Sequence, residues 1–237
     1  MQKPCDTEAL CRSILEHQAD IVSIRNPRIA LKKLTVIIDA ALTLSNTKGF
    51  QAMSLRDLSK TSGVSMGGLY AYFDSKTSLL NMILSEVTRA VEEVLANPPQ
   101  EVADDPRRHL SWLIEEHVLL TEAMLPWFTF AFMEAKNFPR HERRMATDSE
   151  ALTERYFEDV IARAAEQGLL RPGVTPLLAM LIKPLLQDWY VKRAKYHRRG
   201  IAVETYIAAV QNMIMDAAFE PSGHSRLGKA DQGRILP

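Results

Sequence analysis

The chain has 237 residues, enough for one large or two modest domains with hydrophobic cores. Its composition is 46% hydrophobic and 24% charged, and its formal net charge is zero, which argues against a generally basic coat for nucleic acid. No apolar run approaches the roughly 20 residues that span a bilayer, and the first residues lack an apolar signal-peptide core, so we expect a cytoplasmic protein with no membrane partner.

Helical signals follow one another along the chain, without strand-like alternation, so the sequence predicts an all-α fold. Residues 1–27 form a helical extension, expected to pack on the domain that follows rather than to be a mobile arm. Its two cysteines, Cys5 and Cys11, would point to different faces of a helix, and we expect reduced thiols rather than a disulfide or metal site. The next helix begins after Asn26-Pro27 and ends at Gly49.

Two short helices come next, joined by a tight turn. Ser54 is a helix N-cap with Asp57 three residues on, and Gly63 stands where a chain leaving a helix favours a left-handed residue. Ser65 caps a second short helix that leads to Tyr70. This layout is that of a helix-turn-helix, whose second helix enters the major groove of DNA. Between Arg25 and Lys76 the sequence carries eight basic and three acidic residues, 8 − 3 = +5, which suits a local phosphate-binding surface.

A fourth helix, from Ser75 to about Ala96, ends at Asn97-Pro98-Pro99. Residues 28–96 are therefore predicted to form the DNA-binding domain with its connecting fourth helix. Residues 97–220 would form a second helical domain, and residues 221–237 a disordered tail. The helices expected there cover 106–125, 127–136, 140–167, 176–199 with a kink at Pro184, and 203–219.

Residues 28–84 resemble the DNA-binding domain of the TetR family of bacterial repressors. The matching pieces are Ala40-Ala41, Gly49-Phe50, Gly63-Val64-Ser65, Gly68-Leu69-Tyr70, Tyr72-Phe73, and Ser75-Lys76 with Leu79-Leu80. The resemblance implies DNA contacts from Arg56, Met66, Gly67, Gly68, Tyr70 and Lys76. The predicted DNA-binding surface also includes Ser54, Ser65 and Tyr72.

Individual roles follow from the chemistry of these side chains. Arg56 can donate two hydrogen bonds to a guanine, Tyr70 and Tyr72 can reach phosphates, and Lys76 lies in the first turn of a helix. The alternative for Arg56 and Lys76 is a solvated surface charge. Many family members carry threonine or another polar residue at Gly68, so this chain departs from the family at a position that reads bases.

The resemblance also implies that the second domain binds a small effector in a helix-lined cavity. The candidates are His117, Thr121, Met124, Phe128, Phe132, Tyr156 and Trp189. For each of them a packed core is the competing interpretation, and for His117 a core histidine with a satisfied hydrogen bond. No arginine or lysine lies on the inward face of the helix at 106–125, which favours a neutral or weakly polar hydrophobic effector, aromatic or acyl-bearing.

The last two helices each carry a wide apolar stripe, so we expect a homodimer built on Leu181, Leu185, Tyr206, Val210 and Met213. Enzyme signals are poor: His141-Glu142 begins like a zinc-protease helix, but Met145 replaces the second histidine. The basic run 192–199 is a second nucleic-acid patch or, more often for such runs, a solvated helix end.

The sequence thus predicts a ligand-responsive dimeric repressor on double-stranded palindromic operator DNA, without cofactor or metal. An architectural DNA-binding protein and, less favoured, an enzyme with its active site in the second domain are the alternatives.

Overall fold

The structure, a computed structural model, describes residues 6–17 and 26–220. In these residues every element is helical apart from an isolated bridge between Leu170 and Phe219, so the all-α prediction is confirmed. The predicted tail at 221–237, Cys5 and the second half of the extension lie outside the described residues. In chain order the elements are α1 Thr7–His17, α2 Pro27–Lys48, α3 Leu55–Ser62, α4 Met66–Leu69, α5 Lys76–Leu95, α6 Gln100–Ala103, α7 Pro106–Ala123, α8 Leu125–Glu134, η1 Ala135–Asn137, α9 Arg140–Glu166, α10 Leu177–Val191, α11 Arg193–Arg198 and α12 Val203–Ala218.

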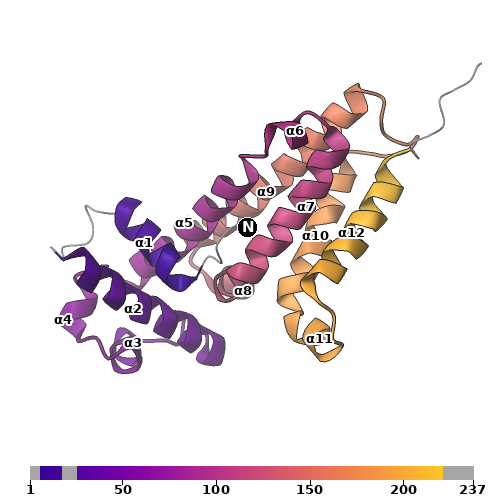
Figure 1. The fold of residues 1–237 in the computed structure, drawn as a ribbon. Helices are drawn as coiled ribbons and strands as arrows, with labels where there is room; N and C mark the ends of the chain where they lie inside the picture. Colours follow the sequence, from indigo (N-terminus) through magenta and orange to yellow (C-terminus); the bar gives the residue numbers. More distant parts are fainter. Residues whose placement is uncertain (1–5, 18–25, 221–237) are drawn as a thin grey trace, which may run out of the picture.

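Helices α1 to α4 gather at one end of the molecule and will be called the head (Figure 1). Local chemistry sets their bounds. The Asn26 side chain accepts from the first amides of α2, and Gly49 ends that helix at φ 83°. Ser54 and Asp57 form a reciprocal capping box at the start of α3, and Gly63, with φ 69°, takes the left-handed conformation that turns the chain toward α4.

Helix α1 packs against α2 and α5. Leu10, Cys11 and Ile14 are buried in that contact, and Ser13 Oγ donates to Glu86 Oε2 of α5 at 3.1 Å. Burial raises the pKa of the Cys11 thiol to about 12, so it stays protonated and behaves as a small apolar side chain. This half of the extension therefore packs on α2 and α5, as expected, and is not a mobile arm.

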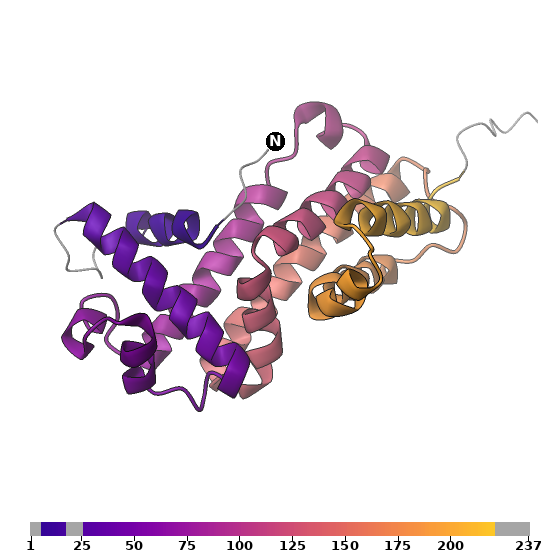
Figure 2. The same ribbon diagram turned by 60° about the horizontal axis from the view of Figure 1, so that its bottom comes forward.

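Helix α5 runs from the head into the second bundle, where it lies against α7, α8 and α9 (Figures 1 and 2). At the far end, α7 packs on α12 and α9, and α10 packs on α9 and α7. Within the described part of the chain no single helix is long and apolar enough to cross a membrane. Only α7 together with the segment 125–137, bent by 93°, meets those criteria.

One predicted helix is divided in the structure. The segment expected to run from 176 to 199 breaks at Lys192, which separates α10 from α11, while Pro184 stays inside α10. Pro184 lacks an amide hydrogen and removes one helical bond, but the surrounding helices pack on α10 and hold it together. Trp189 stacks on Tyr196 at this break, with 5.3 Å between ring centroids, so α11 folds back onto the end of α10.

Candidate functional site: a DNA-binding head and an internal cavity

The head presents two of the expected DNA contacts on its surface. Arg56 is exposed in the first turn of α3, and among the described residues no ion pair or hydrogen bond holds its guanidinium. Tyr70, which follows α4, is 53% exposed, and its hydroxyl has no hydrogen-bond partner among the described residues. Both groups are available to a partner, as a base-reading arginine and a phosphate-binding tyrosine would have to be.

Ser54 and Ser65 are helix caps. The Oγ of Ser54 accepts from the amide of Asp57 at 3.1 Å, and the Oγ of Ser65 accepts from the amide of Gly68 at 3.2 Å. Each cap fixes where its helix begins, so its first effect on DNA binding is to orient α3 or α4.

The two glycines of α4 differ in their surroundings. A Cβ at Gly68 would lie 2.8 Å from Val64 Cγ1, whereas a Cβ at Gly67 would meet nothing within 4 Å. Gly68 therefore lets α4 pack closely on the turn that precedes it, which gives a structural reason for the departure noted in the sequence. Gly67 leaves its backbone open to the outside, beside the half-buried Met66.

Tyr72 is not at the surface. Its side chain is fully buried, and its hydroxyl donates to the carbonyl oxygen of Ala30 in α2 at 3.0 Å. The sequence interpretation, in which this hydroxyl contacts a phosphate, was wrong, because the Tyr72 side chain is buried while that of Tyr70 is exposed. Tyr72 instead ties the end of the helix-turn-helix to α2.

Lys76 has a structural role that its position alone does not reveal. Its Nζ donates to the carbonyl oxygens of Phe50, Gln51 and Met53, at 3.1, 2.8 and 3.1 Å. These carbonyls belong to the loop between α2 and α3. With all three ammonium hydrogens directed at the loop, Lys76 is neither the free phosphate contact nor the solvated charge that the sequence suggested.

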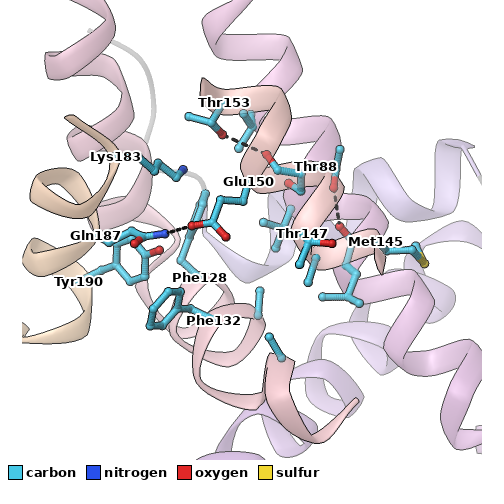
Figure 3. A pocket seen from close by; sticks show the side chains of 17 residues that line it. Thr88, Phe128, Phe132, Met145, Thr147, Glu150, Thr153, Lys183, Gln187 and Tyr190 are labelled. Carbon is cyan, nitrogen blue, oxygen red and sulfur yellow. Dashed lines mark hydrogen bonds between the residues drawn. The ribbon is translucent and has the colours of Figure 1, made fainter. Parts of the chain in front are cut away.

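A cavity of about 140 Å³ lies between α5, α8, α9 and α10 (Figure 3). Most of its lining is apolar, and its polar side chains come mainly from α9 and α10. The lining residues are Leu84, Val87, Thr88, Val91, Phe128, Ala131, Phe132, Ala135, Met145, Ala146, Thr147, Ser149, Glu150, Thr153, Lys183, Gln187 and Tyr190.

Two of the seven predicted effector residues, Phe128 and Phe132, line this cavity, and their rings contact Tyr190 at centroid distances of 5.8 and 6.0 Å. His117 lies behind the lining, where its Nε2 is 3.0 Å from Lys183 Nζ.

The other four candidates are not in the lining, and for them the packing alternative holds. Thr121 and Met124 are buried, with the Thr121 hydroxyl bonded to Val118 O. Trp189 donates from Nε1 to Glu122 Oε2 at 2.9 Å, and the half-buried Tyr156 packs against the core away from the cavity.

The sequence interpretation missed the polar part of the lining: Glu150, Lys183, Gln187 and Tyr190. A signal for three of them was present, because Lys183, Gln187 and Tyr190 are spaced i, i+4 and i+7 and so share one face of a helix. In the structure Gln187 Nε2 donates to Glu150 Oε1, which links α10 to α9 (Figure 3).

The expected dimer residues divide by exposure. Leu181 and Met213 are 56% and 49% exposed, Leu185 and Tyr206 are half-buried, and Val210 is buried within the protomer. Val210 was therefore wrongly placed in an interface, since a partner cannot cover a side chain that its own core already covers. Leu177 and Met180, which the sequence interpretation did not include, lie beside Leu181 on α10 and are also exposed.

Of the five lysines and arginines in the basic run at 192–199, three form ion pairs within the protomer. Arg193 pairs with Glu122 at 2.8 Å, and Lys192 and Lys195 both pair with Asp188. This arrangement favours the solvated helix end over a second nucleic-acid patch. In the described part of the chain no cluster of histidine, cysteine, aspartate or glutamate could hold a metal ion.

Head and cavity meet at Phe50, in the loop that Lys76 holds. The Phe50 amide donates to Glu134 Oε2 at the end of α8, at 3.2 Å, and its ring lies edge-on to Phe130 with 5.4 Å between centroids. Helix α8 also supplies part of the cavity wall. Phe50 therefore joins the head to a helix of the cavity wall.

Comparison with known proteins agrees with this architecture. Residues 37–83 match the family model described as bacterial regulatory proteins, tetR family. The chain is 40% identical over 193 residues to the HTH-type transcriptional repressor KstR2 of Rhodococcus jostii (strain RHA1), a match covering 79% of this chain and 91% of that one.

Two solved structures share the fold. The MbdR regulator from Azoarcus sp. CIB superposes with a TM-score of 0.64 at 18% identity, covering 78% of this chain and 98% of that one. The regulator FadR from Bacillus subtilis, solved in complex with stearoyl-CoA, gives a TM-score of 0.59 at 14% identity, covering 77% and 97%.

Proposed function

Since the chain belongs to the TetR family of DNA-binding transcriptional regulators, we propose that it is a dimeric repressor that leaves its operator when an effector enters the α5–α8–α9–α10 cavity. Its relatives are regulators rather than enzymes. The observation that carries the proposal is that α5 belongs to both parts. Its first residue, Lys76, holds the head loop, and four later residues line the cavity: Leu84, Val87, Thr88 and Val91.

The size of the cavity supports a switching role. A cavity of about 150 Å³ in another protein accommodates benzene, and the one described here, at about 140 Å³, is similar. A drug-sized ligand typically occupies about 300–1,000 Å³. An effector larger than a single ring must push the walls apart, and it then stabilises the widened state by its differential affinity.

The walls that move would change the geometry of the heads. Two heads on a symmetric dimer fit two half-sites only at a spacing set by the DNA helix, about 34–36 Å apart or a multiple of it. Rotation of α5 or α8 in each protomer alters that spacing, so the widened state binds the operator less well. Effector binding then lowers the affinity for the operator by the same factor by which operator binding lowers the affinity for the effector.

The exposed apolar side chains of α10 and α12 are the proposed dimer surface. Leu177, Met180 and Leu181 follow one another along α10, and Met213 lies on α12, all about half exposed. Such a two-helix face closes on its symmetry copy as a four-helix bundle. The dimer gives two heads and therefore a palindromic operator. As a regulator of bacterial transcription, the protein would act in the cytoplasm.

The proposed effector is a molecule with a largely apolar body. Phe128, Phe132, Met145 and the aliphatic residues of α5 supply the large apolar side chains of the cavity wall. The B. subtilis regulator was solved with stearoyl-CoA, an acyl compound, which is consistent with a long apolar ligand in this fold. An aromatic or acyl-bearing molecule suits the wall described here.

The test uses a matched pair on α8. Phe132 and the adjacent Met133 are both exposed, at 41% and 52%, but only Phe132 lines the cavity. A fluorescein-labelled DNA from upstream of the coding sequence is titrated with each protein, and phenylacetate, octanoate and their alcohols are then added. We expect the parent and Met133→Ala to release DNA, and Phe132→Ala to need more compound. A DNA complex that no compound affects would instead support the architectural alternative.

A further inference from the structure

The least expected group in the cavity is a buried lysine. Lys183 is 5% exposed, and its Nζ lies 3.0 Å from His117 Nε2 of α7. It projects from α10 beside Thr153 and Glu150 of α9 and Phe128 of α8 (Figure 3). Among the described residues, His117 is the only hydrogen-bond partner of this ammonium group. Two of its three hydrogens therefore lack an acceptor there.

The histidine beside it cannot neutralise the charge. Burial and the charge of Lys183 lower the pKa of His117 well below its usual range, so the ring is neutral. Its Nε2 accepts from Lys183, which leaves the hydrogen on Nδ1, and that atom has no partner among the described residues. Lys183 thus has two unused donor hydrogens, and His117 has a third, on Nδ1, behind the cavity lining.

Two carboxylates on α9 face the lysine at longer range. Glu150 and Glu154 raise the pKa of Lys183, whereas burial, the larger effect, lowers it to about 8. The lysine is therefore still mostly protonated at pH 7. Glu150 Oε1 is already an acceptor for Gln187 Nε2, and no hydrogen bond joins Glu150 to Lys183. A buried cation in contact only with a neutral ring is costly unless an anion joins it.

We propose that Lys183 binds a carboxylate of the effector, whose ring or acyl body packs on Phe128, Phe132 and Tyr190. This inference rests on the proposed function and names the ligand class of the same cavity: a monoanionic carboxylic acid with an apolar body. It replaces the sequence expectation of a neutral effector. That expectation considered only the inward face of α7, whereas the cation comes from α10.

The geometry fits one carboxylate better than a larger anion. One oxygen can accept from the Lys183 ammonium, while the opposite wall, formed by α5 and α8, is apolar. Glu150 and Glu154 would repel a second negative charge placed nearby. The two carboxylates therefore set the charge that the cavity accepts, and Gln187 keeps the carboxylate of Glu150 in place.

The experiment compares acids with alcohols of the same body. Phenylacetate and 2-phenylethanol, and octanoate and 1-octanol, are titrated into the full-length dimer by calorimetry at pH 7. The variants are Lys183→Met, which keeps the length and removes the charge, and Glu150→Gln, which removes the repelling carboxylate. Lys192→Met is the control, because Lys192 is exposed near the end of the same helix.

The parent and Lys192→Met should bind each acid at least about tenfold more tightly than its alcohol, since a charge-assisted hydrogen bond is about twice as strong as a neutral one. Lys183→Met should lose that preference and still bind the alcohols. Glu150→Gln should bind the acids more tightly than the parent. Because an uncompensated charge is removed, Lys183→Met should melt at or above the temperature of the parent, and Lys183→Gln serves as the second variant.

Three results overturn the assignment. An equal affinity for acid and alcohol in the parent would show that the cavity reads no charge. A preference for acids that survives in both Lys183 variants would move the anion site elsewhere, while the effector function would stand. Failure of all four compounds to bind the parent would count against the proposed effector cavity itself, and with it against the carboxylate site.

Discussion

The triple hydrogen bond of Lys76 allows a quantitative prediction. In Lys76→Met the aliphatic stem remains over the Phe50 ring, which the ammonium now approaches at 5.2 Å, while the charge and its three donors are lost. The carbonyl oxygens of Phe50, Gln51 and Met53 then lose their only side-chain donor in the described structure. The loop that connects α2 to α3 should therefore loosen.

The expected loss in unfolding free energy is that of about one hydrogen bond to a charged group, rather than three. Hydrogen bonds to charged groups contribute about 1.5–3 kcal/mol each when one partner is removed. Lys76 is only half-buried, so water can reach the loop carbonyls in the variant and restore part of the loss. We expect a loss of about 2 kcal/mol in unfolding free energy, which for a chain of this size lowers the melting temperature by about 4–8 °C.

Urea unfolding followed by circular dichroism, together with thermal melting, measures this loss without DNA or effector. Lys60→Met is the matched control, because Lys60 is an exposed lysine of the same head with no ion pair in the described structure. It should unfold like the parent. If Lys76→Met also unfolds like the parent, the three bonds do not stabilise the loop, and Lys76 returns to being a free contact for phosphate.

Four further predictions test the head, the dimer and the cavity. Tyr70→Phe should weaken binding to all DNA sequences alike in gel-shift titrations, whereas Tyr72→Phe should cost about 1 kcal/mol of stability and leave operator affinity unchanged; equal effects on DNA binding would contradict the assignment. Gly67→Ala should raise the melting temperature slightly, because alanine favours helix, whereas Gly68→Ala should lower it through the contact with Val64, and the reverse order would refute the packing argument. Leu181→Asp with Met213→Asp should give monomers in light scattering, whereas Leu119→Asp, at an exposed position of α7, should remain dimeric like the parent. Because burial lowers the pKa of Lys183 from 10.5 to about 8, the unfolded chain holds a proton that the folded chain has lost between those values, so the parent should gain stability relative to Lys183→Met as pH rises from 8 to 10, and parallel stability curves would exclude the shift.

Helix bounds in the head could be predicted because the signals are local. Asn26, Ser54, Gly63 and Ser65 act on backbone groups within a few residues, so their chemistry can be read without knowing the fold. The break of the long helix at Lys192 was not predictable in this way. It depends on Trp189 packing against side chains that return from later in the chain.

The candidate site was only half predictable for the same reason. Tyr70 and Tyr72 have the same chemistry and lie two residues apart, and only the path of the chain after α4 decides which of them is exposed. The lining of the cavity depends on which faces of four helices meet. The high density of aromatic residues on α8 was enough to identify Phe128 and Phe132. Trp189 was selected on the same ground, as an aromatic residue, but it packs in the core and does not line the cavity.

Two walls of the cavity, α5 and α8, converge on a single residue of the head. Through Lys76, α5 holds the Phe50 carbonyl, and through Glu134, α8 holds the Phe50 amide. Phe50 begins the short loop whose other end, Ser54, caps α3. In the proposed mechanism, an effector that separates the walls would pull on both polar groups of Phe50 at once, and the loop would pass that displacement to α3, where Arg56 faces outward. The wall of the cavity of about 140 Å³ is thus connected to the DNA-binding surface over very few hydrogen bonds.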